Sequence, residues 1–348
     1  MPRLAHLALL SFFCVATAEA AEFWIPEGDE VFGEVQVVEA RFEDTFVSLA
    51  RTYNVGFEEL KQANPGVDAW LPGAGTKITI PTLYVLPRAP HRGIVVNVAE
   101  LRLYYFPADS KPPPEGVPAG SQRVITHPIS IGRLDWSTPL GVTSITGKVS
   151  NPSWYPPQSI RDEHAARNDL LPRIVPPGPD NPLGKHAMRL ALGSYLIHGT
   201  NKPSGVGMRV THGCIRMFPE DIEALYKTVP VGTSVNIVNQ PVKLGWTADG
   251  TLYLEAHPAL HESNFDGESV ADDVAAAAEP VQESPLTSLM RAYVAATEER
   301  RVALDWNAAE RVAQSTSGVP EAVSVAGSVT PLTAEIAAAA ASADHGGH

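Results

Sequence analysis

Apolar residues recur with the spacing of a helix near the start of the chain. Four of them stand at positions i, i+3, i+4 and i+7 and mark one helical face: Phe46, Leu49, Ala50 and Tyr53. Asp44 precedes this face as a candidate N-cap, and a second short helix over residues 57–63 ends at Asn64-Pro65-Gly66. Residues 34–38 and 77–80 have the pattern of strands. The sequence therefore predicts a small β-α-α-β unit over residues 34–81.

A linker with prolines over residues 82–92 leads into a region where short apolar runs replace the helical spacing. These runs predict strands at residues 94–98, 102–106, 125–131, 142–145, 195–198 and 234–238. Glycine and proline separate the runs, which favours a mainly-β sandwich or barrel-like fold. One helix is predicted to begin at Pro219. Residues 151–182 are irregular and rich in proline, and so long a loop inside a compact domain is usually functional.

The composition changes after Pro258. The chain has 26 basic and 39 acidic residues and a net charge of −13, and the stretch from Pro258 to His348 holds 14 acidic and 4 basic ones. The first 257 residues therefore carry only −3, and the chain lacks the basic character of a nucleic-acid-binding protein. Apolar residues at 286–294 predict a helix that can extend to Trp306. The rest of the tail is expected to be disordered.

The first twenty residues have the pattern of a secretory signal. Arg3 supplies a positive charge, Leu7–Val15 is apolar apart from one serine, and Ala18-Glu19-Ala20 fits the cleavage pattern. The apolar run is shorter than the roughly 20 residues that span a bilayer, and no later segment is long and apolar enough. We therefore expect export without a transmembrane segment, and loss of Cys14 with the signal.

Cys214 is then the single cysteine of the mature chain, which excludes a disulfide framework. His198, His212 and Arg216 are close to it in sequence, and a neighbouring imidazole or cation lowers the pKa of a thiol and activates it. Gly213 allows close backbone approach, and backbone N–H groups at such a turn can stabilise an oxyanion. Nucleophile, base and oxyanion donors together indicate acyl transfer.

Other interpretations of these residues stay open at this point. A zinc ion could take its ligands from His186, His198, His212 and Cys214, although their spacing matches no standard zinc signature. A redox-sensing thiol would need a second, resolving cysteine, which the mature chain lacks. A lone cysteine can also be buried and inert.

The segment around Cys214 resembles the catalytic domain of the YkuD-type L,D-transpeptidases. The family signature is matched by His198-Gly199-Thr200 and by Thr211-His212-Gly213-Cys214-Ile215-Arg216. Supporting matches lie upstream at Ile131-Gly132-Arg133, Thr138-Pro139-Leu140-Gly141 and Asn181-Pro182-Leu183-Gly184. The resemblance covers about residues 92–257 and implies the mainly-β fold of that family.

The resemblance also implies a two-step exchange on the tetrapeptide stems of peptidoglycan. Cys214 would attack the carbonyl before the terminal D-Ala to form a thioester, with His198 as general acid and base. Supporting roles toward the base, the oxyanion or the substrate would fall to Gly199, Thr200, Thr211, His212, Gly213 and Arg216. For the last of these a bidentate carboxylate contact and a purely architectural role are both open. Neither a metal nor an organic cofactor is implied.

Residues 34–81 resemble a LysM domain, the module that binds peptidoglycan and chitin. The matches are Val35-Gln36-Val37, Asp44-Thr45, Leu49-Ala50, Tyr53-Asn54-Val55, Leu60, Asn64-Pro65, Leu71 and Ile78-x-Ile80-Pro81. Glu43 stands where that family usually has glycine. The combination of both domains looks closest to periplasmic enzymes of Gram-negative bacteria and implies peptidoglycan as the partner.

The predicted organisation is a signal peptide (1–20), a LysM domain (34–81), a catalytic domain (92–240), its C-terminal extension (241–260) and an acidic, alanine-rich tail (261–348). The expected product is a 3-3 cross-link, or an outer-membrane lipoprotein joined to the wall through its lysine. The alternatives are an L,D-carboxypeptidase, which uses water as acceptor, and a non-catalytic peptidoglycan-binding protein.

Overall fold

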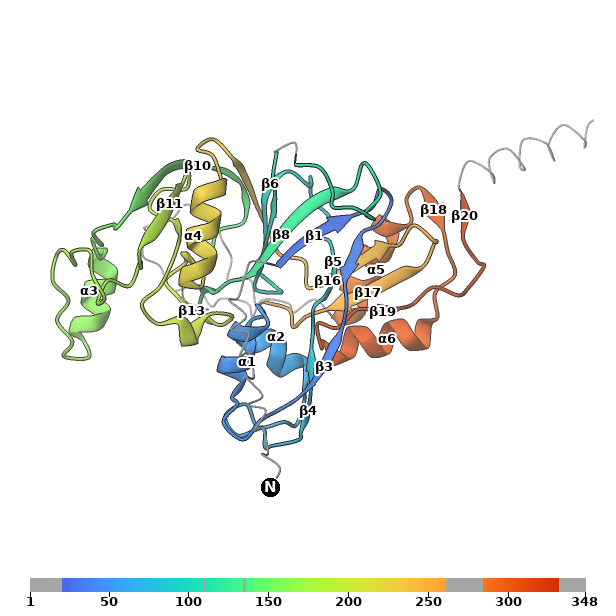
Figure 1. The fold of residues 1–348 in the computed structure, drawn as a ribbon, viewed down its shortest axis with the longest axis horizontal. Coiled ribbons are helices and arrows are strands. Elements are labelled where there is room, and N and C mark those ends of the chain that lie inside the picture. Colours follow the sequence, from blue (N-terminus) through green and yellow to red (C-terminus); the bar gives the residue numbers. More distant parts are fainter. Residues whose placement is uncertain (1–20, 109–110, 134–135, 261–283, 332–348) are drawn as a thin grey trace, which may run out of the picture.

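The computed structural model describes residues 21–108, 111–133, 136–260 and 284–331. Figure 1 shows a central sheet, a small N-terminal unit below it and a C-terminal unit beside it. The predicted signal and residues 261–283 and 332–348 of the tail lie outside the described residues. Within the described part, no helix combines the length and the apolar character needed to cross a membrane.

Nine strands form the central sheet, in the order β1-β8-β7-β6-β15-β10-β11-β12-β14. They are β1 (Ala21–Ile25), β6 (Gly93–Asn97), β7 (Arg102–Phe106), β8 (Gln122–Pro128), β10 (Gly141–Ser150), β11 (His186–Leu190), β12 (Leu196–His198), β14 (Ile215–Arg216) and β15 (Ser234–Val238). β6 pairs with β15 in parallel, as does β12 with β14, and the other neighbours are antiparallel. The predicted mainly-β fold is confirmed.

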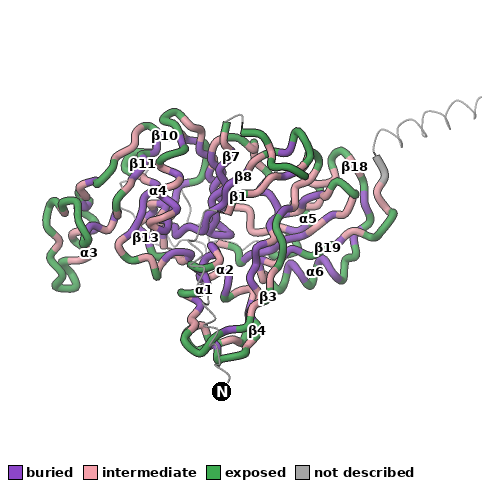
Figure 2. Tube along the Cα trace, in the orientation of Figure 1, coloured by how far each residue is buried: buried purple, intermediate pink, exposed green. Residues whose placement is uncertain are grey.

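The main core lies between this sheet and α4 (Pro219–Thr228), which packs against β11. Pro219 opens the helix as predicted, and Ile222 and Leu225 join Met188 and Ile197 in the core. Figure 2 shows the buried residues gathered along the central strands. A short parallel pair, β9 (Ile131–Gly132) with β13 (Arg209–Thr211), contacts β14 through β9. The 3-10 turn η1 (Pro203–Gly205) is held there by Ser130 Oγ, which donates to the carbonyl oxygen of Gly205 at 2.7 Å.

The N-terminal unit has the predicted β-α-α-β order. It consists of β3 (Gln36–Glu39), α1 (Phe46–Thr52), α2 (Phe57–Ala63) and β4 (Lys77–Ile80), with β3 and β4 antiparallel. The expected N-cap at Asp44 is wrong, because the side chain of Thr45 accepts from the backbone N–H of Ser48. Residues 82–92 are more than a linker, since β5 (Leu83–Val85) pairs with β2 (Val31–Gly33).

The C-terminal unit corrects the prediction for the tail. The first helix, α5 (Pro285–Ala296), ends ten residues before Trp306, where a second helix, α6 (Trp306–Ser315), begins. α5 packs against β16 (Val242–Trp246) and α6 against β17 (Leu252–Ala256), and the short β18 (Arg300–Arg301), β19 (Glu321–Ala322) and β20 (Thr330–Pro331) complete the unit. Residues 300–331 are thus folded where disorder was expected. The alanine runs at 275–278 and 337–341, which suggested low complexity, lie outside the described residues, whereas the apolar residues of α6 form a buried face: Ala308, Ala309, Val312 and Ala313.

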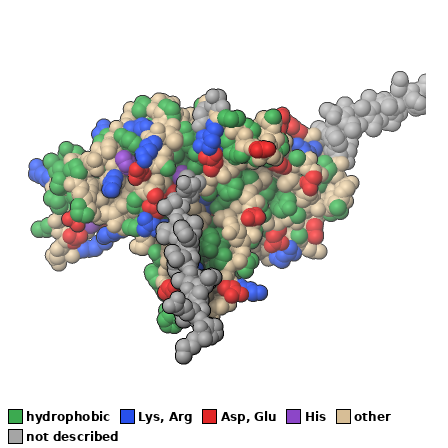
Figure 3. Space-filling view, in the orientation of Figure 1, with side chains coloured by type: hydrophobic (Ala, Val, Ile, Leu, Met, Phe, Trp, Pro, Cys, Tyr) green, Lys and Arg blue, Asp and Glu red, His purple; other side chains and the backbone are tan. Residues whose placement is uncertain are grey.

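The proline-rich residues 151–182 project from the opposite end of the molecule and contain one helix, α3 (Gln158–Ala165). Half of the residues of α3 are exposed, and Ile160 is buried. On the face drawn in Figure 3, acidic and basic side chains both occur, and no broad basic patch covers it. This agrees with the nearly neutral charge of the first 257 residues.

Candidate active site

The parallel pair β12–β14 brings the two principal predicted residues together. Its register places Ile197 opposite Ile215, and His198 opposite Arg216. Ile197 and Ile215 are fully buried in the main core. Because side chains alternate along strands, His198 and Arg216 share the opposite face, and Cys214 directly precedes β14. The base candidate therefore ends β12 and the nucleophile stands just before β14, on two strands that pair directly with each other.

The turn that carries Cys214 is held by hydrogen bonds. Thr211 Oγ1 donates to the carbonyl oxygen of Cys214 at 2.6 Å, and Thr138 Oγ1 donates to that of Gly213 at 2.9 Å. Gly213 has φ +94°, and a β-carbon there would lie 2.6 Å from the ring of Tyr195. The predicted glycine is thus required by both conformation and space.

The side chain of Cys214 is partly buried, and burial raises the pKa of its thiol above the usual value. A hydrogen bond with the backbone of Leu196 and the positive charge of Arg216 lower the pKa, but they do not compensate for burial. The resting thiol is therefore protonated at neutral pH. It needs a base when it attacks.

His198 can serve as that base in its neutral form. Its Nδ1 lies 2.6 Å from the carbonyl oxygen of Gly199, and because a carbonyl can only accept, Nδ1 carries the proton. Nε2 keeps its lone pair. Burial, together with the charge of Arg216, lowers the pKa of His198 to about 3. The resting pair is thus a neutral thiol and a neutral imidazole, not a preformed ion pair.

The residues beside His198 are fixed by the upstream Asn-Pro-Leu-Gly match. The side chain of Asn181 is buried; it donates to the carbonyl of Pro152 at 2.8 Å and accepts from the N–H of Leu183 at 2.9 Å. Gly184, at φ +66°, approaches so closely that a β-carbon would lie 2.7 Å from the backbone nitrogen of Thr200. Thr200 Oγ1 accepts from the N–H of Lys202. Gly199 and Thr200 therefore have positioning contacts.

Among the described residues, Arg216 has no hydrogen-bond partner for part of its guanidinium. Its backbone exchanges hydrogen bonds with Ser130 at 2.8 and 2.9 Å, which fixes the residue beside β9. Its Nε is buried without a hydrogen-bond partner among the described residues. A buried donor of this kind is costly unless a ligand meets it.

His212 is linked to the proline-rich segment by a residue that the sequence did not single out. Its Nε2 lies 2.9 Å from Glu163 Oε2, on α3, and the same oxygen accepts from Arg133 at 2.6 Å. Arg167 also pairs with Glu163. Burial and the charge of Arg133 lower the pKa of His212 to about 4. The only sequence signal for Glu163 was its place in a loop predicted to be functional.

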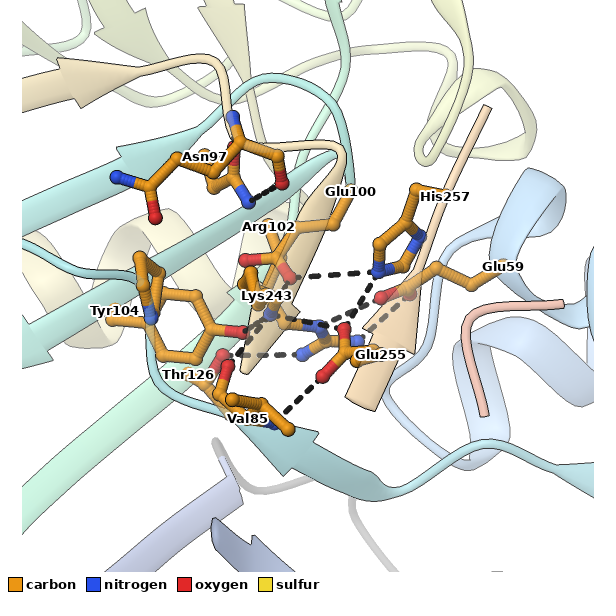
Figure 4. Close-up of polar contacts among 12 residues, drawn as sticks. Glu59, Val85, Asn97, Glu100, Arg102, Tyr104, Thr126, Lys243, Glu255 and His257 are labelled. Atoms are coloured by element: carbon orange, nitrogen blue, oxygen red, sulfur yellow. Dashed lines mark hydrogen bonds and ion pairs between the residues drawn. The ribbon is translucent and has the colours of Figure 1, made fainter. Parts of the chain in front are cut away.

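The four residues considered as zinc ligands are not brought together. Within the described residues, one group of three His, Cys, Asp or Glu side chains brings its ligand atoms within 4.8 Å of one another: Glu100, Glu255 and His257. The four ligands considered for zinc form no such group there: His186, His198, His212 and Cys214. Figure 4 shows that Lys243 lies between Glu100 and Glu255, so its ammonium supplies the positive charge that a metal would bring.

Comparison with known proteins finds L,D-transpeptidases. The family model of the YkuD L,D-transpeptidase catalytic domain matches residues 91–237. The Escherichia coli protein named probable L,D-transpeptidase YcfS is 44% identical over 267 residues, or 73% of this chain and 80% of that protein. The Escherichia coli probable L,D-transpeptidase ErfK/SrfK is 38% identical over 302 residues, or 86% and 89%. The solved catalytic domain of the E. faecium L,D-transpeptidase is 19% identical, with a TM-score of 0.30 over 44% of this chain and 100% of that one.

Proposed function

Since the chain belongs to the YkuD family of L,D-transpeptidases, we propose that Cys214 and His198 exchange peptide bonds on peptidoglycan tetrapeptide stems through a thioester. The observation that supports the proposal is the parallel pair β12–β14: His198 ends the first strand, Cys214 precedes the second, and the carbonyl of Gly199 takes the Nδ1 proton so that Nε2 keeps its lone pair. This arrangement suits a nucleophile that is activated only when a carbonyl is in place.

In the first step, Sγ of Cys214 bonds to the carbonyl carbon that precedes D-Ala, and the thiol proton moves to Nε2 of His198. The carbon–nitrogen bond then breaks, and D-Ala leaves with that proton on its amine. Backbone N–H groups at Gly213 and Cys214 are the donors proposed for the oxyanion. An acceptor amine attacks the thioester in the second step and gives its proton to His198. The carbon–sulfur bond breaks and the thiol regains its proton.

Arg216 and the proline-rich segment also have roles in the proposed reaction. The buried Nε of Arg216 suits a substrate carboxylate, because it has no partner among the described residues. Glu163 joins the proline-rich segment to His212 and so forms a wall of the substrate site. Thr211 and Gly213 hold the turn, and Gly199 and Thr200 hold the base.

For residues 34–81 we propose a LysM domain that binds the glycan strands of peptidoglycan. The β-α-α-β order and the sequence matches support it. Binding the polymer would raise the local concentration of stems near Cys214. The N-terminal signal supports export to the periplasm. There the acceptor would be a second stem, which gives a 3-3 cross-link, or a lysine of an outer-membrane lipoprotein.

The test is the intact mass of the mature protein after incubation with purified disaccharide-tetrapeptide, beside a Cys214→Ala control. We expect an adduct that lacks D-Ala on the native protein only. Released products then distinguish cross-linking from the use of water, which is the carboxypeptidase alternative. Glycan binding without any adduct or D-Ala release would contradict the proposal and favour a non-catalytic wall-binding protein.

A further inference from the structure

We infer that the N-terminal module, residues 34–81, is a positioning element of the active site, because it holds the connecting loop, residues 199–213, that joins the base to the nucleophile. A tether needs only a flexible link to the catalytic domain. This module instead packs its helices against the loop whose ends carry His198 and Cys214. Only the kinetic test of this inference depends on the proposed activity.

The closest approach joins two glycines. The N–H of Glu58 donates to the carbonyl oxygen of Gly207 at 3.1 Å. Gly207 has φ +83°, and a β-carbon there would collide with the backbones of Gly56 and Phe57. From the other side, a β-carbon on Gly56 would lie 3.1 Å from the α-carbon of Gly207. Backbone meets backbone here, and neither side leaves room for a side chain.

The next residue of the loop belongs to the core of the module. Met208 packs against the apolar cluster that contains Phe46, Leu60 and Ile78. Beyond it, β13 runs to Thr211, whose hydroxyl binds the carbonyl oxygen of Cys214. Only a few residues of ordered strand and turn therefore separate the module from the nucleophile.

A buried ion pair holds the module in this place. Arg102 on β7 donates to both carboxylate oxygens of Glu59 on α2, at 2.7 and 2.8 Å, as Figure 4 shows. Both side chains are almost fully buried. Glu59 also accepts from the N–H of Gly56, the residue that meets Gly207. The central sheet, the module and the connecting loop are thus joined by consecutive contacts.

A second contact reaches the chain on the other side of the nucleophile. Arg51 on α1 donates to both carboxylate oxygens of Glu220 at 2.8 and 2.9 Å, and its guanidinium lies 5.8 Å from the ring centre of Phe218. Phe218 and Glu220 follow Cys214 by four and six residues. The module therefore contacts the chain before and after Cys214, which a tether has no reason to do.

The test uses a soluble stem tetrapeptide without sugar, so that loss of polymer binding cannot change the rate. The variant is Gly207→Ala in the full-length protein. Its matched control is Gly116→Ala, because Gly116 has φ +87° and open space around its α-carbon. We expect kcat to fall at least tenfold in Gly207→Ala with a smaller change in KM, and amide hydrogen exchange to accelerate across residues 199–213. The control should stay within twofold in both.

Equal kcat and equal exchange in the two folded variants would overturn the inference. If Gly207→Ala does not fold, Arg51→Glu takes its place and should lower kcat and accelerate hydrogen exchange in the loop. The charge swap that combines Arg51→Glu with Glu220→Arg should then restore both quantities. A swap that restores neither would also overturn the inference. An inactive parent protein would refute the proposed function, whereas the exchange measurement would still decide on the positioning role.

Discussion

Two groups of buried ionisable side chains in this protein differ in their charge: one is neutral, and the other is charged and paired. At the active site, burial raises the pKa of Cys214 and lowers that of His198, so both are neutral. Behind the central sheet, Lys243 donates to Glu100 and lies 2.9 Å from Glu255, and burial of Lys243 is outweighed by these carboxylates, which raise its pKa. Cys214 and His198 are thus neutral groups that can react, whereas Lys243 and its carboxylates are paired with one another.

The difference lies in the partners that each site offers. Lys243 has two carboxylates and the carbonyl of Val85, and His257 binds Glu255 at 2.6 Å. The pair at the active site has one nearby cation, Arg216, and backbone dipoles. A paired cluster resists loss of one member, because the remaining charge is then buried alone. Replacing an unpaired reactive group should change the free energy of unfolding little but should abolish the activity.

The largest expected effect is therefore on activity alone. Cys214→Ser should lower transpeptidation by at least about 1,000-fold, because the hydroxyl is a far weaker nucleophile beside the same neutral base. The melting temperature should remain near that of the parent, since the side chains are similar in size. Steady-state rates and thermal melting of the same preparation test both parts. A large drop in melting temperature would mean that Cys214 is mainly structural.

The paired cluster should show the reverse. Lys243→Met leaves Glu100 and Glu255 facing each other, and we expect a loss of about 3–5 kcal/mol in the free energy of unfolding. Lys227→Met is the control, because Lys227 pairs with Glu223 at the exposed end of α4, where such a pair contributes about 0.5 kcal/mol or less. Denaturant unfolding measures both. Equal losses in the free energy of unfolding of the two variants would show that the buried ion pairs of Lys243 do not stabilise the fold more than an exposed pair does.

The pH dependence of the thiol gives a smaller but more specific effect. Reaction with iodoacetamide needs the thiolate, and a raised pKa leaves little of it at pH 7. The rate should therefore rise from pH 7 to pH 9 and level off at a higher pH than it does for an ordinary thiol. His198 stays neutral above about pH 3, so its titration adds no step in this range. A rate that is already level above pH 6 would instead indicate a preformed thiolate–imidazolium pair.

The sequence predicted the short-range parts of this protein well. The β-α-α-β order of residues 34–81 and the helix from Pro219 follow from local periodicity, and the mainly-β fold and the transpeptidase family are confirmed. Local pattern could not predict that α6 folds onto β17, because its alanines bury a face only against a strand far away in sequence. It could not foresee the pairing of Arg102 with Glu59 either, since 43 residues separate them.

Glu163 shows why the site itself was only partly predictable. The residues next to Cys214 carry a recognisable local signature, whereas Glu163 reaches His212 from 49 residues away through an irregular segment. No periodicity marks such a contact. It exists because α3 returns to the turn that holds the nucleophile, and only the structure shows that return.

This contact leads to the smallest expected effect. Glu163→Gln keeps an oxygen that can accept from His212 but removes the negative charge that holds Arg133 and Arg167. Charge-assisted hydrogen bonds at a partly exposed site contribute about 1 kcal/mol, so we expect kcat/KM to fall about three- to tenfold. Glu223→Gln, on α4, removes only an exposed pair with Lys227 and should change kcat/KM by less than twofold. If both variants kept the parent's kcat/KM, the contact between Glu163 and His212 would contribute nothing to catalysis. The functional residues would then be confined to β12, β14 and the turn that carries Cys214.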